Sequence, residues 1–281
     1  MKLTKLLATI LSFAVILFAG CDKNDIVEEE NGNNDNGNDN GQDFNYGSVE
    51  DVDGNIYNTV VIGEQEWMAE NLRTSKYKEG STIPGISDPE EWFYDDEGAY
   101  FVLSEEALGT EFDSYEQFVE IYGKHYNWFT INNNKGLCPD GWRVPTDDDW
   151  SELENYLMTT HNIHNDVESN DQEGVGNYLK SCRQNDTPLG GGCETEEHPY
   201  WKGFENIYGV DYYGFSALPA GEVSINGYTH GVTGLTKFWS YSLSGTSSSF
   251  VRILINTNPA MASDIEIHKN GLSVRCMRDV D

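Results

Sequence analysis

The residues best suited to covalent chemistry are the five cysteines of the chain, and Cys21 differs from the other four in its surroundings. It directly follows an apolar run, residues 6–20, which two lysines precede and which ends in Ala-Gly. A basic segment, an apolar segment and small residues before a cysteine are typical of a bacterial lipoprotein signal. We therefore predict a signal peptide over residues 1–20 and lipid on the thiol of Cys21. An ordinary signal peptide is the alternative, and a transmembrane helix is disfavoured because the run is shorter than about 20 residues.

The four remaining cysteines are Cys138, Cys182, Cys193 and Cys276. An exported chain meets an oxidising compartment, where an even number of cysteines indicates disulfide bonds. Three pairings are possible, and we favour Cys138–Cys276 with Cys182–Cys193. The inner pair then closes a short glycine-rich loop, and the outer pair ties the end of the chain to its middle. A zinc site is the alternative, but the sequence contains no C-x-x-C motif.

Aromatic residues are mixed with acidic residues in the loop-like segment between Cys182 and Gly221. Aromatic faces can stack on sugar rings, and carboxylates accept hydrogen bonds from hydroxyl groups. We therefore predict a ligand-binding surface in this segment, with glycan as the ligand. The alternative is that these side chains fill the core, which is the commoner use of aromatic residues. The predicted ligand-binding residues are Tyr200, Trp201, Tyr208, Tyr212 and Tyr213.

Three acidic or histidine-containing segments have spacings that metal sites also use, and each has a simpler explanation. The segment Asp51–Asn55 resembles the start of an EF-hand loop, but Ile62 stands where position 12 of that loop needs a carboxylate. The aspartates Asp147–Asp149 fit the first turn of a helix. His161 and His164 lack a third ligand. Phosphate loops and dinucleotide fingerprints are also missing from the sequence, so we predict no catalytic residue, no metal and no cofactor.

The strong negative charge of the chain limits its partners. Acidic residues outnumber basic residues by 48 to 17, which gives a formal net charge of −31. Loss of the signal peptide would remove two lysines and make the charge more negative still. Nucleic-acid binding relies on Lys and Arg at phosphates, and anionic lipids also attract basic segments. We expect no nucleic-acid partner, and we expect membrane contact only through the lipid on Cys21.

The residues after Cys21 divide into a linker and a folded part. Residues 31–41 consist only of Asn, Gly and Asp. They offer no apolar surface to offset the entropy of ordering, so we predict that residues 21–45 form a lipidated, disordered tether. Residues 46–281 have the length and the aromatic content of one globular domain.

The folded part shows patterns for antiparallel strands and about two helices, so we predict an α+β fold. A strand meander is expected over residues 49–68, with Asp53-Gly54 and Gly63-Glu64 as its turns. Helices are expected over residues 114–123 and 147–159, the second opened by a capping box from Thr146 to Asp149. Residues 81–112 lack a clean period. Further strands are expected at residues 232–242, 250–256 and 272–278.

Five motifs follow one another along the folded part and carry a family resemblance. They are YNTVVIGEQEWMAENL (residues 57–72), LCPDGWRVPTDDDW (137–150), YGFSALPAG (213–221), FWSY (238–241) and GLSVRCMRD (271–279). Together they closely resemble the Fibrobacter succinogenes major paralogous domain family, over residues 51–279. That family is common on predicted lipoproteins of Bacteroidetes and Fibrobacteres. It carries little assigned function, so the resemblance limits the fold more than the chemistry.

A more distant likeness concerns the segments 142–150 and 273–276. They look like the core of C-type-lectin-like and formylglycine-generating (sulfatase-modifying-factor-like) domains, in which a nested disulfide layout is usual. That likeness implies a single disulfide-bonded domain and supports the pairing favoured above. Formylglycine-generating enzymes use two reactive cysteines near the C-terminus, whereas only Cys276 lies there in this chain. The sugar-binding motifs of calcium-dependent lectins are also missing from this sequence.

These patterns together predict a lipid-anchored protein of the cell envelope, on the outer membrane and exposed at the cell surface, with a non-catalytic binding domain. The expected partner is a glycan or another envelope protein. Two alternatives stay open: an enzyme of the formylglycine-generating-like fold with an unrecognised site, and a purely structural or adhesive surface protein. Free-thiol measurement separates the cysteine-dependent enzyme from the binding module.

Overall fold

The computed structural model describes residues 44–109, 111–168 and 173–280. The predicted signal peptide, the predicted lipidation at Cys21 and nearly all of the predicted tether lie outside these residues. Within them, no helix is both long enough and apolar enough to cross a membrane.

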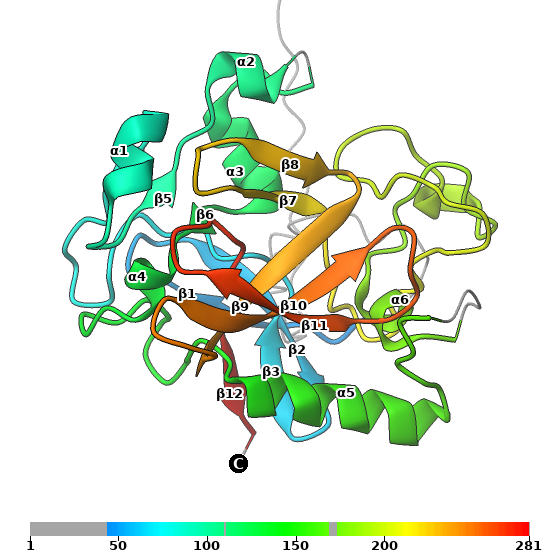
Figure 1. The fold of residues 1–281 in the computed structure, drawn as a ribbon. Coiled ribbons are helices and arrows are strands. Elements are labelled where there is room, and N and C mark those ends of the chain that lie inside the picture. Colours follow the sequence, from blue (N-terminus) through cyan, green and yellow to red (C-terminus); the bar gives the residue numbers. More distant parts are fainter. Residues whose placement is uncertain (1–43, 110, 169–172, 281) are drawn as a thin grey trace, which may run out of the picture. The chain divides into compact units, whose positions relative to one another are not determined.

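Twelve strands in the described residues form three sheets (Figure 1). The first sheet has the order β1-β2-β3-β12, the second β11-β10-β9-β7-β8 and the third β4-β5-β6. All pairings are antiparallel except β4 with β5 and β7 with β9. The strands are β1 (Gly47–Glu50), β2 (Ile56–Ile62), β3 (Gln65–Met68), β4 (Gly85–Ile86), β5 (Tyr100–Phe101), β6 (His125–Tyr126), β7 (Ala220–Val223), β8 (Thr229–Val232), β9 (Leu235–Leu243), β10 (Ser248–Ile255), β11 (Ala262–Ile267) and β12 (Met277–Asp279).

Six α-helices and one 3₁₀ turn accompany these sheets in the described part of the chain, so the α+β fold class is confirmed. The two longest helices are the two that the sequence predicts, α3 and α5. The helices are α1 (Pro89–Tyr94), α2 (Glu105–Leu108), α3 (Tyr115–Tyr122), α4 (Trp128–Ile131), α5 (Asp147–His161) and α6 (Val175–Leu179), and the 3₁₀ turn is η1 (Gly191–Cys193).

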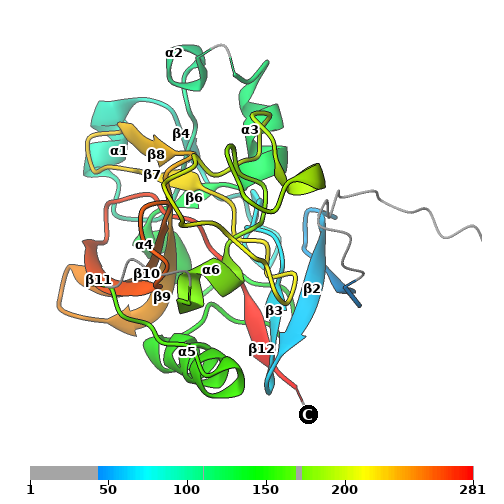
Figure 2. The same ribbon diagram turned by 90° about the vertical axis from the view of Figure 1, so that its right-hand side faces the viewer.

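Helix α5 has the predicted capping box at its start. The backbone N–H of Asp149 donates to Oγ1 of Thr146 at 3.2 Å, and the N–H of Thr146 donates to the Asp149 carboxylate at 2.7 Å. These two bonds satisfy N–H groups that the first turn of a helix leaves without partners. The ring of Trp150 packs 4.5 Å from Trp67 of β3 and 5.6 Å from Phe238 of β9. Helix α5 therefore packs against both the four-stranded and the five-stranded sheet. Figure 2 shows β12, β3 and β2 to the right of α5 and β9 and β10 above it.

The predicted strand meander is present, but the prediction for its first turn is wrong. Ile62 pairs with Gln65, so Gly63-Glu64 is the expected two-residue turn. Glu50 pairs with Ile56, so residues 51–55 form a longer loop in place of a turn at Asp53-Gly54. The carboxylate of Asp51 accepts hydrogen bonds from the N–H groups of Asp53 and Asn55 at 2.8 and 3.0 Å. These local bonds compete with strand pairing and hold the wider loop.

The predicted strand 232–242 is two strands, β8 and β9. The N–H of Gly234 donates to the carbonyl of Gly231 at 2.8 Å, and Thr233 has a positive φ of 69°. This turn breaks the apolar alternation that suggested one strand. Strands β7 and β11 were not predicted, and at the end of the chain only Met277–Asp279 pairs as the regular strand β12.

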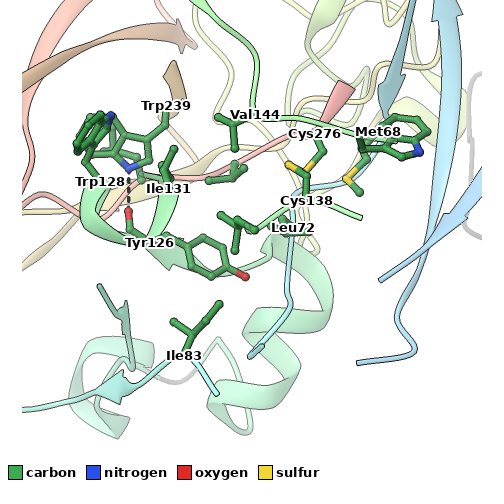
Figure 3. Packing of buried hydrophobic residues seen from close by; sticks show 14 of the residues in the cluster. Met68, Leu72, Ile83, Tyr126, Trp128, Ile131, Cys138, Val144, Trp239 and Cys276 are labelled. Carbon is green, nitrogen blue, oxygen red and sulfur yellow. Dashed lines mark hydrogen bonds between the residues drawn. A yellow bond between two sulfur atoms is a disulfide. The ribbon is translucent and has the colours of Figure 1, made fainter. Parts of the chain in front are cut away.

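Both predicted disulfide bonds are confirmed. Cys138 is bonded to Cys276 and Cys182 to Cys193, with S–S distances of 2.04 and 2.07 Å. Figure 3 shows the first bond inside the main hydrophobic cluster, beside Met68, Leu72 and Val144. In the same cluster, the indole N–H of Trp239 donates to the Tyr126 carbonyl at 2.8 Å. The outer disulfide is therefore part of the core.

Candidate functional site

Two of the predicted ligand residues, Tyr212 and Tyr213, lie in a group of aromatic side chains that we call the tyrosine–histidine cluster. Its other members are Tyr156 and His161 of α5 and Tyr178 of α6. Tyr212 has 49% of its surface exposed, and the other four are half-buried. Half-buried rings in mutual contact offer rigid apolar faces to solvent.

The angle between ring planes differs from pair to pair within the tyrosine–histidine cluster. The rings of Tyr212 and Tyr178 lie 5.6 Å apart with planes only 29° from parallel. The ring of His161 meets Tyr212 at 4.5 Å and 66°, and Tyr213 meets Tyr212 at 5.1 Å and 59°. Such tilted and stacked arrangements are the favoured ones for aromatic pairs. The exposed ring of Tyr212 is therefore supported from several sides.

The loop that carries Tyr212 and Tyr213 is fixed by buried polar groups beneath it. The carboxylate of Asp211 accepts hydrogen bonds from the N–H and the hydroxyl of Ser216 at 2.8 and 2.6 Å. The guanidinium of Arg275 donates to the carbonyls of Phe215 and Ser216. The N–H of Tyr212 donates to the carbonyl of Tyr178 at 3.1 Å. This loop is thus tied to α6 and to the last segment of the chain.

The same loop contains backbone conformations that only such anchoring maintains. Asp211 and Ser216 have positive φ values of 46° and 52°, which residues other than glycine seldom adopt. Gly214 has φ 74°, where an added Cβ would meet the Tyr46 hydroxyl at 2.7 Å. The cost of these conformations is offset by the bonds to Asp211 and Arg275. A loop held in this way loses little entropy when a ligand binds.

Burial keeps His161, Tyr178 and Tyr213 of the cluster uncharged at neutral pH. Burial lowers the pKa of His161, whose Nε2 lies 2.8 Å from the Tyr213 hydroxyl. Burial, and to a smaller extent Glu173 and Tyr212, raises the pKa of Tyr178. Burial and a hydrogen bond with Tyr156 raise the pKa of Tyr213. The hydroxyl groups of Tyr178 and Tyr213 therefore remain protonated, and each can exchange hydrogen bonds with a ligand.

Asp211 of the loop and Arg275 beneath it are both buried. Burial raises the pKa of Asp211 to about 6 and lowers that of Arg275 to about 9. Both groups are still charged at pH 7, and their mutual attraction opposes the effect of burial on each. They act on the cluster through the backbone that they hold.

The other predicted ligand residues are not in this cluster, or are not on the surface. The prediction for Trp201 is wrong: its side chain is completely buried and its indole N–H donates to the Ala217 carbonyl at 3.0 Å. Tyr200 packs 5.0 Å from His198, in a different group of rings. Tyr208 is half-buried. The segment after Cys182 thus supplies both core and surface aromatic residues.

The group of rings around Tyr200 has its own polar network. The Tyr122 hydroxyl lies 2.6 Å from Nδ1 of His198, and Nε2 of His198 lies 3.0 Å from the carboxylate of Glu111. Tyr122 is completely buried. The network therefore connects α3 to the segment after the inner disulfide, and its central hydroxyl is closed to solvent.

The segments with metal-like spacing are explained by contacts within the protein. Asp51 accepts three hydrogen bonds from Asp53 and Asn55 of its own loop and one from the Tyr57 hydroxyl of β2 at 2.6 Å. Asp147 is paired with Arg252, and Asp149 caps α5. Among the described residues, no group of three or more His, Cys, Asp or Glu side chains is placed to hold a metal ion.

Three members of the cluster were not predicted. Tyr156 stands one residue before Leu157 of the buried stripe of α5, so a helical projection places it at the edge of the covered face. His161 is the last residue of the same helix. Tyr178 belongs to a helix of five residues, too short for a periodic pattern to reveal. Sequence signals could have placed Tyr156 and His161 on the same helix, but not beside Tyr212.

Comparison with known proteins gives one match. The model of a family described as the Fibrobacter succinogenes major domain matches residues 60–278. No match was found among curated proteins or among solved structures. The matched range includes both disulfides and every residue of the tyrosine–histidine cluster.

Proposed function

Because the chain belongs to the Fibrobacter succinogenes major domain family, we propose that it is a cell-envelope lipoprotein that presents a non-catalytic, glycan-binding domain. Lipid on Cys21 anchors it to the outer membrane, and residues 22–45 hold the domain away from the lipid surface. Stable anchoring needs two or more acyl chains, since each CH₂ buried in the membrane contributes about 0.8 kcal/mol of binding free energy.

One observation carries the binding proposal: the exposed ring of Tyr212, stacked on Tyr178 in an anchored loop. A sugar ring has faces of C–H groups that pack well against an aromatic face, and hydroxyl groups at its edge. The cluster offers both partners, because each of its tyrosines carries a hydroxyl group on an aromatic ring. The bonds from Asp211 and Arg275 hold the site in one geometry before a ligand arrives.

The alternative of a cysteine-dependent enzyme has less support. Cys276 is bonded to Cys138 in the core, and the four cysteines of the described part are all in disulfides. A thiol must be free and ionised to act as a nucleophile. The alternative of a structural or adhesive protein makes a different prediction, namely that no glycan binds at Tyr212.

A glycan array with plant, mucin and microbial glycans tests the proposal. The protein is the mature chain with Cys21→Ser, which makes it soluble without lipid. We expect binding to at least one glycan, and Tyr212→Ala should weaken it at least tenfold, about 1.4 kcal/mol. Tyr228→Ala is the matched control, because Tyr228 is also an exposed tyrosine, at 66% against 49% for Tyr212, and lies outside the cluster. The absence of binding across the array would reject the glycan proposal.

The anchoring part is tested separately. Metabolic labelling with a fatty acid should label the wild-type protein and not the Cys21→Ser variant. Protease treatment of whole cells should then remove the domain if it faces outward. Labelling that persists in the variant would contradict lipidation at Cys21.

A further inference from the structure

We propose that the exposed face of helix α1 docks a basic segment of another protein, one that carries arginine or lysine beside an apolar side chain. We call this face the α1 surface. It consists of three aromatic rings and four carboxylates, those of Phe93, Tyr94, Phe129, Glu90, Glu91, Asp96 and Glu97. Figure 1 shows α1 at the edge of the molecule, away from α5 and α6. The inference therefore concerns a second surface and does not depend on glycan binding at Tyr212.

The apolar part of the α1 surface is a pair of adjacent rings that the fold leaves in solvent. Tyr94 is 69% exposed and Phe93 is 39% exposed. Their ring centroids lie 5.1 Å apart with planes 82° from parallel, an edge-to-face contact. Half-buried Phe129 of α4 extends the pair, because Nζ of Lys269 lies 6.0 Å from the centroid of its ring and from that of Phe93. Grouped exposed aromatic rings, unlike single ones, are typical of protein interfaces.

Helix α1 holds these rings in a fixed position although it has only six residues. At its start, the Asp88 carboxylate accepts hydrogen bonds from two N–H groups of the first turn, each at 2.9 Å. At its end, Nζ of Lys269 donates to two backbone carbonyls at 2.8 and 3.1 Å. Trp92 is 1% exposed, and its indole N–H donates to the Ser224 carbonyl at 3.2 Å. A surface fixed at both ends and from below loses little entropy when a partner docks.

The charges around the rings favour a basic partner. Four exposed carboxylates flank the rings, and within residues 44–109, 111–168 and 173–280 none of the four forms an ion pair. They are Glu90, Glu91, Asp96 and Glu97. Lys269 also lies at this surface, but its ammonium group is engaged by the carbonyls at the end of α1. An arginine of a partner can pair with a carboxylate and stack on a neighbouring ring at the same time.

The same charges disfavour the other occupants of such a surface. A second copy of this chain would bring the same four carboxylates against each other, and each copy has a net charge of −31. An anionic lipid surface would be repelled for the same reason. A basic protein segment is attracted instead, and opposite charges across an interface speed association and select the partner.

Selection from a library of random dodecapeptides displayed on phage tests the inference, with the mature chain carrying Cys21→Ser as the immobilised protein. We expect the enriched peptides to combine arginine or lysine with an aromatic or large aliphatic residue. A synthetic peptide of enriched sequence should bind Phe93→Ala and Tyr94→Ala at least tenfold more weakly. Phe204→Ala is the matched control for Phe93, at 40% exposed against 39%, and should leave the affinity unchanged. Tyr212→Ala should also leave it unchanged, because Tyr212 belongs to the other surface.

A second pair of variants tests the contribution of charge. Glu90→Gln/Glu91→Gln should weaken peptide binding at least threefold and make it less sensitive to salt, because two of the attracting carboxylates are lost. Asp148→Asn/Glu152→Gln removes the same charge from exposed positions of α5 and should change the affinity less than twofold. Equal effects of the two pairs would mean that the peptide responds to the net charge of the protein, which would overturn the inference.

Other outcomes would also overturn the inference. They are the absence of enrichment, enriched peptides without net positive charge, and peptide binding that ignores Phe93 and Tyr94. Two further measurements test the rival occupants: binding to vesicles of phosphatidylcholine, and sedimentation velocity over a range of protein concentrations. Vesicle binding or dimer formation that Tyr94→Ala abolishes would assign the α1 surface to a membrane or to a second copy. Each of these results would leave the glycan proposal standing, since no carbohydrate is present. Circular dichroism of each variant confirms that it is folded.

Discussion

The two disulfides should contribute different amounts to stability, and the structure sets the difference. The residues of the outer pair, Cys138 and Cys276, are 138 positions apart, and those of the inner pair, Cys182 and Cys193, are 11 positions apart. A cross-link stabilises mainly by restricting the unfolded chain, and the effect grows with the logarithm of the loop length. The loop-entropy relation gives about 5 kcal/mol for the outer bond and about 3 kcal/mol for the inner bond. The expected difference is therefore about 2 kcal/mol.

The comparison is controlled for burial, because the four cysteines are similarly buried in the folded state. All are buried, with exposed fractions from 0 to 5%. Replacement of each pair by alanine should therefore leave cavities of similar cost, and the difference between the variants should report the loops. The variants are Cys138→Ala/Cys276→Ala and Cys182→Ala/Cys193→Ala, each in the mature chain with Cys21→Ser.

Equilibrium unfolding in urea measures the difference. The outer-pair variant should lose about 2 kcal/mol more than the inner-pair variant, and its m-value should rise more because a less restricted unfolded chain exposes more surface. If the outer-pair variant is unfolded in water, sucrose restores a measurable transition by favouring the compact state. An inner-pair variant that loses as much as the outer-pair variant, or more, would refute the loop argument.

Three further predictions concern single residues. Burial lowers the pKa of Lys180 from 10.5 to about 7, so between pH 7 and 10.5 the unfolded chain holds a proton that the folded chain lacks. The stability of the wild type relative to Lys180→Met should therefore rise with pH across that window, by about 1.4 kcal/mol per pH unit. Urea titrations that give both proteins the same dependence of stability on pH would contradict this. Thr146→Ala should lower the unfolding free energy by about 1 kcal/mol through loss of the α5 cap, and an unchanged urea midpoint would mean that the cap does not contribute. Gly176→Ala should lower the melting temperature, because its Cβ would lie 2.3 Å from the carbonyl oxygen of Ala260, whereas Gly245→Ala meets only the Ser248 hydroxyl at 3.1 Å and should change it little.

Where local chemistry decided the structure, the sequence was sufficient to predict it. The α5 helix has a capping box and a buried stripe within a few residues, and both act without help from distant parts of the chain. The Gly63-Glu64 turn is equally local. The disulfides were predicted because only a few pairings of four cysteines exist. Each of these features depends on residues that are close together in the sequence or few in number.

The failures have two causes. At Asp51 the cause is local, because its carboxylate accepts hydrogen bonds from nearby N–H groups and from the Tyr57 hydroxyl and so holds a loop wider than the predicted turn. The other failures have distant partners. The sequence around Trp201 has the composition of a surface loop, yet Trp201 is buried in a hydrophobic cluster with Val175 and Leu179 of α6. The site itself needs α5, α6 and the Tyr212 loop in one place. No periodicity in the sequence reports such an encounter, because it is fixed by tertiary packing.

The position of β12 has a consequence for the order in which the fold can form. Met277 of β12 pairs with Trp67 of β3, and the N–H groups of Met68 and Leu72 donate to the carbonyls of Cys276 and Val274. The first sheet therefore lacks its final strand until β12 has been synthesised. Contacts between such distant positions form slowly. For the exported lipoprotein proposed above, this delay would leave the first sheet incomplete until β12 has followed it through the translocation channel.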